Sequence, residues 1–168
     1  MPDAVDELIA YRKQCGPVSR MLRRVHRFHK TNPQVLDFLV LELREVRANG
    51  WTRASVGSLW HYGRWVLTQK HRAPGESFVM SNNLFPYFER IIAILHPDLN
   101  GFFEMGKSDA DVDLGTKLEP SPKVRERGYI RRLVWSDGKA IEDGWRPSTP
   151  HEPKPVRRRE RVKRDENC

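Results

Sequence analysis

Apolar residues recur every three or four positions through the first 105 residues, and this spacing predicts helices. Each helical pattern ends at a pair that breaks helices, such as Asn49-Gly50 or His96-Pro97. The expected helices cover residues 3–14, 17–30, 33–48, 55–69 and 84–95. Their shared apolar side predicts a core that contains Val35, Leu39, Leu43, Leu59, Trp60, Phe88, Ile91 and Leu95. The fold class is therefore all-α, a small domain of four to five helices.

Particular residues indicate where these helices begin and how they pack. Pro17 suits the first position of the second helix, because proline lacks an amide that would be unpaired there in any case. Asn32 is expected to cap the third helix, with Pro33 as its first residue. Gly63 lies within the fourth helix and costs ~1 kcal/mol of helix propensity relative to alanine. This cost predicts a close approach of another helix at Gly63.

The chain changes character near residue 106, after which proline, glycine and charged residues dominate. We expect a helical domain over residues 1–106 and a mostly disordered, basic, proline-rich tail over 107–168. Residues 77–81 alternate weakly and predict a minor β element, and residues 129–135 suggest a single hairpin arm or an extended segment. The acidic run 109–114 is expected to be flexible, and it could fold back on the basic surface as a counter-charge.

Composition adds a basic character to this picture. The 168 residues include 30 Lys and Arg against 22 Asp and Glu, which gives a formal charge of +8. A positive field favours polyanionic partners: nucleic acid, an acidic protein or an anionic membrane surface. Two cysteines, Cys15 and Cys168, form no disulfide framework. With neither a signal peptide nor an apolar run long enough to span a bilayer, the sequence predicts a cytoplasmic protein without a membrane partner.

The second predicted helix carries the clearest candidate for binding. At 100° per residue, five cations gather opposite the apolar face in one uninterrupted stripe. The stripe consists of Arg20, Arg23, Arg24, Arg27 and Lys30. Such a row can follow a phosphate backbone. An ordinary solvated helix face explains the pattern equally well, and an anionic membrane surface is the less favoured alternative.

Two further groups of residues suggest contacts with nucleic acid. Arg64, Trp65 and Gln69 share the polar face of the fourth helix, where a tryptophan could stack on a base beside hydrogen-bond donors. Packing of Trp65 under the tail or the loop in the 70s is an equally simple interpretation. The tail adds Arg157, Arg158 and Arg159 within the basic segment 154–164, a pattern typical of non-specific clamps. A solubilising terminus with no partner is the alternative.

Catalytic, cofactor and metal sites are not predicted. The glycines form no phosphate-binding loop, and no serine or cysteine lies in a nucleophile elbow. Asp109, Asp111 and Asp113 alternate like metal ligands but lack the glycine and distal glutamate of a calcium loop. His26 and His29 do not complete a zinc set, and His29 falls on the apolar side of its helix as a packed core residue.

A pattern from Phe28 to about Glu104 resembles a group of small helical proteins encoded by bacteriophages and prophages, chiefly of actinobacteria. The matching residues include Asn32-Pro33, Gly50, Trp65, Asn82-Asn83, Tyr87, Arg90 and Gly101-Phe102-Phe103. The pattern covers a little under half of the chain and leaves out the tail. The resemblance implies a phage origin, and it carries over no activity and no functional residue.

These features predict a non-enzymatic protein that binds nucleic acid, with DNA favoured, as a phage regulatory or accessory factor. The cations of the second helix would hold the backbone, Arg64, Trp65 and Gln69 would touch bases, and the tail would add affinity. The competing hypothesis is a protein-binding module that engages a host or virion protein through Trp65, Trp135 and Trp145. A basic structural or packaging protein is a third possibility, and the sequence does not predict an oligomeric state.

Overall fold

The computed structural model describes residues 3–71, 79–120 and 131–141. The helices are α1 (Ala4–Cys15), α2 (Arg20–Thr31), α3 (Gln34–Ala48), α4 (Val56–His71), α5 (Phe85–Leu95), the 3-10 turn η1 (Pro97–Leu99) and α6 (Asp109–Leu114). Two strands, β1 (Thr116–Pro120) and β2 (Arg131–Trp135), pair antiparallel. The prediction of a mostly helical protein is confirmed.

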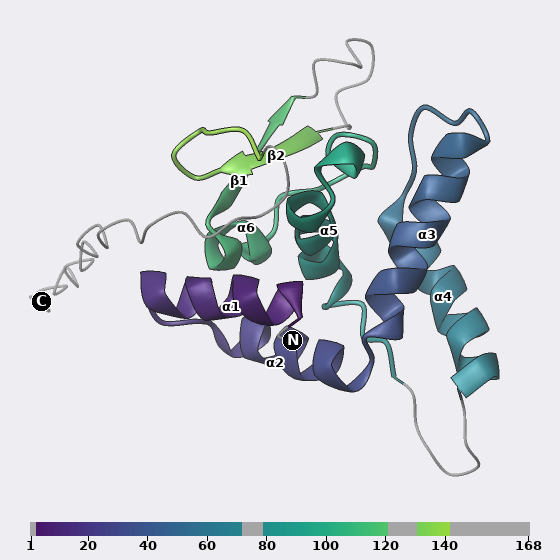
Figure 1. Cartoon of the computed structure of the whole chain (residues 1–168), viewed down its shortest axis with the longest axis horizontal. Helices are drawn as coiled ribbons and strands as arrows, with labels where there is room; N and C mark the ends of the chain where they lie inside the picture. Colours follow the sequence, from purple (N-terminus) through teal and green to yellow (C-terminus); the bar gives the residue numbers. More distant parts are fainter. Residues whose placement is uncertain (1–2, 72–78, 121–130, 142–168) are drawn as a thin grey trace, which may run out of the picture.

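Helix α5 lies at the centre of the fold, and every residue from Tyr87 to Ile94 is buried. Figure 1 shows α5 between the α3–α4 pair on one side and α6 with the β1–β2 sheet on the other. Helices α1 and α2 pack against each other and run side by side along one end of the molecule. Because α5 is enclosed by neighbours on several sides, its apolar residues continue around the helix instead of forming a single stripe.

Six of the eight predicted core residues are fully buried, and the other two, Leu59 and Leu95, are partly buried and pack against the same cluster. The close approach predicted at Gly63 is also confirmed. A Cβ atom at Gly63 would lie 2.7 Å from Cε1 of Phe38 on α3. Glycine therefore allows α3 and α4 to pack at this distance, which is the physical reason for its place inside a helix.

All five predicted helices begin later than expected, by three residues for α2 and by one residue for each of the others. Helix α2 is preceded by Ser19 instead of beginning at Pro17, because the serine hydroxyl accepts a hydrogen bond from the third amide of the helix at 2.9 Å. Helix α3 begins at Gln34, one residue later than expected. Asn32 does not cap it: the Asn32 side chain donates to the Phe28 carbonyl at the end of α2.

The expected end of the folded domain near residue 106 is wrong, because the chain beyond it continues to contribute to the core. Ala110, Leu114, Leu133 and Ile141 all belong to the main hydrophobic cluster. The Asn100 side chain donates to the Leu133 carbonyl at 2.9 Å and accepts from the Leu133 amide at 2.8 Å. These two hydrogen bonds join β2 to the turn that follows α5.

The predicted β element near residues 77–81 is not found in the part of that range that the structure describes. Residues 79–81 belong to no strand, and 77–78 lie outside the described residues. Met80 is buried, and its carbonyl accepts a hydrogen bond from Arg64 at 2.7 Å. A side chain therefore satisfies a backbone group that a strand would have paired with another strand. The expected hairpin arm at 129–135 is present as β2, whose described residues begin at Arg131.

Candidate nucleic-acid interface

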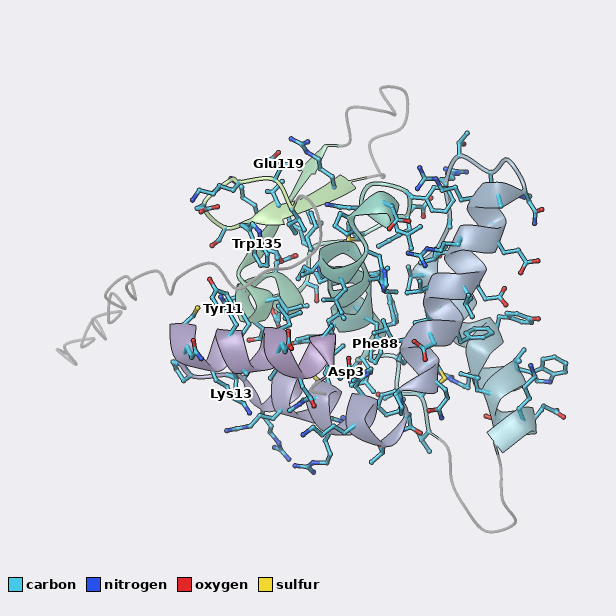
Figure 2. The ribbon with its side chains drawn as sticks, viewed as in Figure 1. Asp3, Tyr11, Lys13, Phe88, Glu119 and Trp135 are labelled. Atoms are coloured by element: carbon cyan, nitrogen blue, oxygen red, sulfur yellow. The ribbon has the colours of Figure 1, made fainter. Side chains whose placement is uncertain are left out.

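Helix α2 holds the predicted cationic stripe on its solvent side. All five side chains are exposed, whereas Leu22, Val25 and His29 on the opposite face are buried against the core. At 1.5 Å per residue, the ten steps from Arg20 to Lys30 cover about 15 Å. Figure 2 shows the side chains of α2 that point away from α1 and into solvent. The prediction that His29 is a packed core residue is confirmed.

The charge at the start of α2 is opposite to what would favour a helix N-terminus, whereas Lys30 in the last turn is favourable. A helix N-terminus carries a partial positive charge, so acidic residues in the first turn stabilise it and cations there cost roughly 0.3–1 kcal/mol each. Helix α1 follows this rule with Asp6 and Glu7, but the first turn of α2 has no acidic residue and begins with Arg20. A local arrangement that opposes stability is typical of a surface used for function.

One carboxylate does approach the start of α2, from a distant part of the chain. Asp113 on α6 accepts hydrogen bonds from the hydroxyls of Ser19 and Tyr87. Burial raises the pKa of Tyr87, and the hydrogen bond to Asp113 raises it further, so the phenol stays protonated as a donor. Asp113 therefore binds the cap of α2 and makes no contact with the five cations among the described interactions.

The acidic run 109–114 was expected to act as a counter-charge for the basic surface, but its described contacts do not involve the stripe. Asp111 pairs with Arg90, whose Nε lies 3.0 Å from one oxygen of Asp111. The segment is also not flexible: it is helix α6, with a capping box formed by Ser108 and Asp111. Asp111 and Asp113 therefore bind groups within the fold, and the stripe keeps its charge.

The nearest acidic partners of the stripe come from α1. Lys30 lies 3.8 Å from Asp6, which also contacts His26 on α2. Asp3 contacts the buried ring of His29. Burial raises the pKa of Asp3, but the hydrogen bonds from His29 and from the Val5 amide outweigh it, and the net pKa lies below the usual value. The carboxylates of α1 therefore hold the histidines and one end of the stripe.

The three residues predicted to touch bases do not act as a group. The guanidinium of Arg64 is used inside the fold, where it donates to the Met80 carbonyl and to the Asn82 side chain. Trp65 and Gln69 remain exposed on the outer face of α4. The tryptophan keeps 64% of its surface accessible, and the two segments expected to cover it, the loop in the 70s and the tail, lie outside the described residues.

Other predicted contact residues fall into two classes. Arg157, Arg158 and Arg159 lie outside the described residues, as does Trp145. Trp135 is partly buried and packs against the core, so it is not a free contact residue. The sequence reasoning missed Trp51, which is 67% exposed in the loop after α3. Its position directly after Asn49-Gly50, outside any apolar periodicity, is the signal that would have identified it.

Comparisons with protein-family models, with curated proteins and with solved structures gave no match. In the described part of the chain, no three His, Cys, Asp or Glu side chains converge as a metal site would require. None of the helices described is long and apolar enough to cross a membrane. Function is therefore inferred from the geometry and charge of the surface.

Proposed function

We propose that this protein binds nucleic acid, with double-stranded DNA as the favoured form, through the exposed cationic stripe of α2. In this proposal the protein is a non-enzymatic regulatory or accessory factor in the host cytoplasm. The assignment to a phage rests on the sequence resemblance alone. The Arg-rich segment around Arg157–Arg159 adds affinity that does not depend on sequence.

One observation carries the proposal: five cations form a row on a single rigid helix and face solvent, and only Lys30, at one end, has a described acidic partner. One strand of duplex DNA carries a negative charge per about 3.4 Å of axis, so a row of about 15 Å along that strand lies opposite roughly four to five phosphates. The stripe therefore matches a phosphate backbone in both length and charge density. A row held by one helix also loses little conformational freedom of the backbone on binding.

The size of the expected effect follows from counterion release. If all five cations contact phosphates, the logarithm of the association constant falls with the logarithm of salt concentration at a slope of about −4.5. Raising the salt from about 50 to 200 mM then weakens binding roughly 500-fold. A contribution of this size is easily separated from that of one or two incidental contacts.

The test is fluorescence anisotropy with a labelled mixed-sequence duplex and the full chain, measured across a salt series. The variant R20Q/R24Q/R27Q removes three charges from the stripe and should reduce the magnitude of the slope by about 2.7. The matched control K70Q/K107Q/K139Q also removes three charges, from exposed lysines of three other segments. We expect the control to change the slope by less than one unit.

A third variant, R157Q/R158Q/R159Q, separates the folded surface from the tail. Equal losses in the stripe variant and the lysine control would mean that net charge alone governs binding, and the proposed interface would be wrong. If only the tail variant loses affinity for the duplex, the Arg-rich segment binds nucleic acid and the stripe does not. In a final series, unlabelled single-stranded DNA and double-stranded RNA of the same length compete with the labelled duplex. If either competes more strongly than unlabelled duplex DNA does, that nucleic acid is the favoured ligand.

A further inference from the structure

An exposed apolar surface lies across the outer faces of α3 and α4. We call it the α3–α4 strip and define it as Phe38, Leu41, Tyr62 and Trp65. Leu41, Tyr62 and Trp65 keep 66%, 49% and 64% of their surface accessible. The rings of Phe38 and Tyr62 are 5.9 Å apart between centroids, which joins the two helices. Residues three apart on one helix are neighbours, so Leu41 and Trp65 extend the strip at either end.

Acidic side chains flank the strip. Asp37 and Glu45 are exposed and lie four residues before and after Leu41, on the same side of α3. Glu42 lies beside them, and its pKa is raised, first by burial and then by the charge of Glu45, although Lys70 opposes the shift. The exposed cation beside them, Arg44, pairs with Asp98 at 3.5 Å, so the carboxylates set the charge of this side of α3 and would repel phosphates.

Aromatic rings beside carboxylates suit the guanidinium group. Arginine stacks on the face of tryptophan or tyrosine while its edge donates to a carboxylate. Lysine provides a charge but lacks the flat surface for stacking. The chemistry of the strip therefore selects an arginine-rich segment with few acids.

We propose that the α3–α4 strip docks this chain's own arginine-rich segment, residues 154–164. The segment carries seven cations and one acid: Lys154, Arg157, Arg158, Arg159, Arg161, Lys163 and Arg164 against Glu160. Its charge complements the three acids of α3, and Val156 and Val162 can cover part of the exposed apolar surface. This inference goes beyond the proposed function, because it requires no nucleic acid.

The length of the chain allows this contact. The described part ends at Ile141, and the sixteen residues from there to Arg157 reach at most about 55 Å when extended. A folded unit of about 140 residues is roughly 40 Å across, so the path around its surface to the opposite face is about 60 Å, which Arg161–Arg164, twenty or more residues after Ile141, can span. A tethered segment has an effective concentration on the order of millimolar, which favours it over the cationic stripe of a second copy at ordinary protein concentrations.

The experiment uses a fluorescein-labelled peptide with the sequence of residues 153–165 and measures anisotropy without nucleic acid. The receptor is the full chain carrying R157Q/R158Q/R159Q, which weakens its own segment as a competitor. We expect saturable binding to this receptor and at least fivefold weaker binding to the unaltered chain. Equal binding to both chains would show that the tethered segment does not occupy the strip, and the proposal would be wrong.

Two pairs of variants in the same receptor locate the site. D37N/E45Q should weaken binding about tenfold, since two exposed charge contacts are lost, whereas E7Q/D109N removes two exposed acids elsewhere and should leave it unchanged. W65A should abolish most of the binding, whereas W51A removes an equally exposed tryptophan outside the strip and should not.

Equal effects within either pair would mean general electrostatic or apolar adhesion, and absence of peptide binding would also overturn the proposal. Sedimentation velocity of the unaltered chain provides the last arm. A dimer that is lost in both D37N/E45Q and R20Q/R24Q/R27Q would assign the strip to a second copy and refute the intramolecular contact. Every one of these outcomes is independent of whether the stripe binds DNA.

Discussion

Replacement of Arg90 tests the account of the fold most directly. Arg90 is completely buried on α5, and its guanidinium joins α5 to α6 and to the loop between them. It lies 3.0 Å from both oxygens of Asp111 and 2.8 Å from Glu89, and it donates to the backbone carbonyls of Pro86 and Gly106. Arg90→Met keeps a long apolar side chain and removes all of these hydrogen bonds.

The expected cost of Arg90→Met is large because its partners stay behind. Removal of one member of a buried ion pair typically costs ~3–5 kcal/mol, since the remaining charge is buried without compensation. Glu89 is 5% exposed and the side chain of Asp111 16%, so water compensates only part of the loss. A small domain has about 5–15 kcal/mol of total stability, so a loss of this size lies within the measurable range.

The assay is urea unfolding of the full chain followed by far-ultraviolet circular dichroism. The matched control is Arg44→Met, because Arg44 is half exposed and lies 3.5 Å from Asp98. An exposed pair contributes about 0–1 kcal/mol, so the control should unfold close to the unaltered chain. The triple variant R90M/E89Q/D111N should recover much of the loss, because no buried charge is left unpaired. If R90M costs less than about 1 kcal/mol, or if R44M costs as much, the network does not hold α6 and our reasoning about it is wrong.

Two further substitutions test packing and titration. Gly63→Ala should destabilise the fold by about 1–3 kcal/mol in thermal unfolding, because the new Cβ atom would clash with Phe38. Phe38→Leu in the same chain should recover part of the loss. A Gly63→Ala variant with unchanged stability would contradict the close approach of α3 and α4. Burial raises the pKa of Glu89 from 4.5 to about 7, against the opposing charge of Arg90, so the folded state binds a proton that the unfolded state releases. The contribution of Glu89 to the free energy of unfolding should therefore fall as the pH rises from about 4.5 to 7. Glu89→Gln should flatten the dependence of stability on pH in that window. If the variant shows the same dependence as the unaltered chain, Glu89 does not titrate there.

The helices could be predicted from the sequence because their signals are local. The apolar periodicity of the third helix and the stop at Asn49-Gly50 depend only on neighbouring residues, and both are found in the structure. Helix boundaries were less accurate, since Pro17 and Ser19 offer competing starts and the hydroxyl decides between them. Local chemistry therefore determines the elements, and small differences in capping determine their ends.

The part of the fold beyond residue 106 could not be predicted because it depends on distant contacts. The run 109–114 has two buried apolar side chains, Ala110 and Leu114, too few to show a helical period. It is held by Arg90, which lies 21 residues away from Asp111. Likewise, β2 is joined to Asn100 across 33 residues. No window of a single helix or strand contains such a pair.

The candidate site likewise has features that depend on local sequence and features that depend on distant contacts. A stripe on one helix is fixed by helical geometry, so the five cations of α2 were placed correctly as a face from their spacing alone. Whether a charge is free depends on partners elsewhere: Arg64 shares the chemistry of Arg20, yet a backbone carbonyl and an amide oxygen from the segment before α5 occupy it. The acids of α3 are equally local in sequence, but they become a flanking charge for Tyr62 and Trp65 only once Gly63 brings α4 against Phe38. The charge asymmetry between α2 and the α3–α4 strip is thus a product of packing.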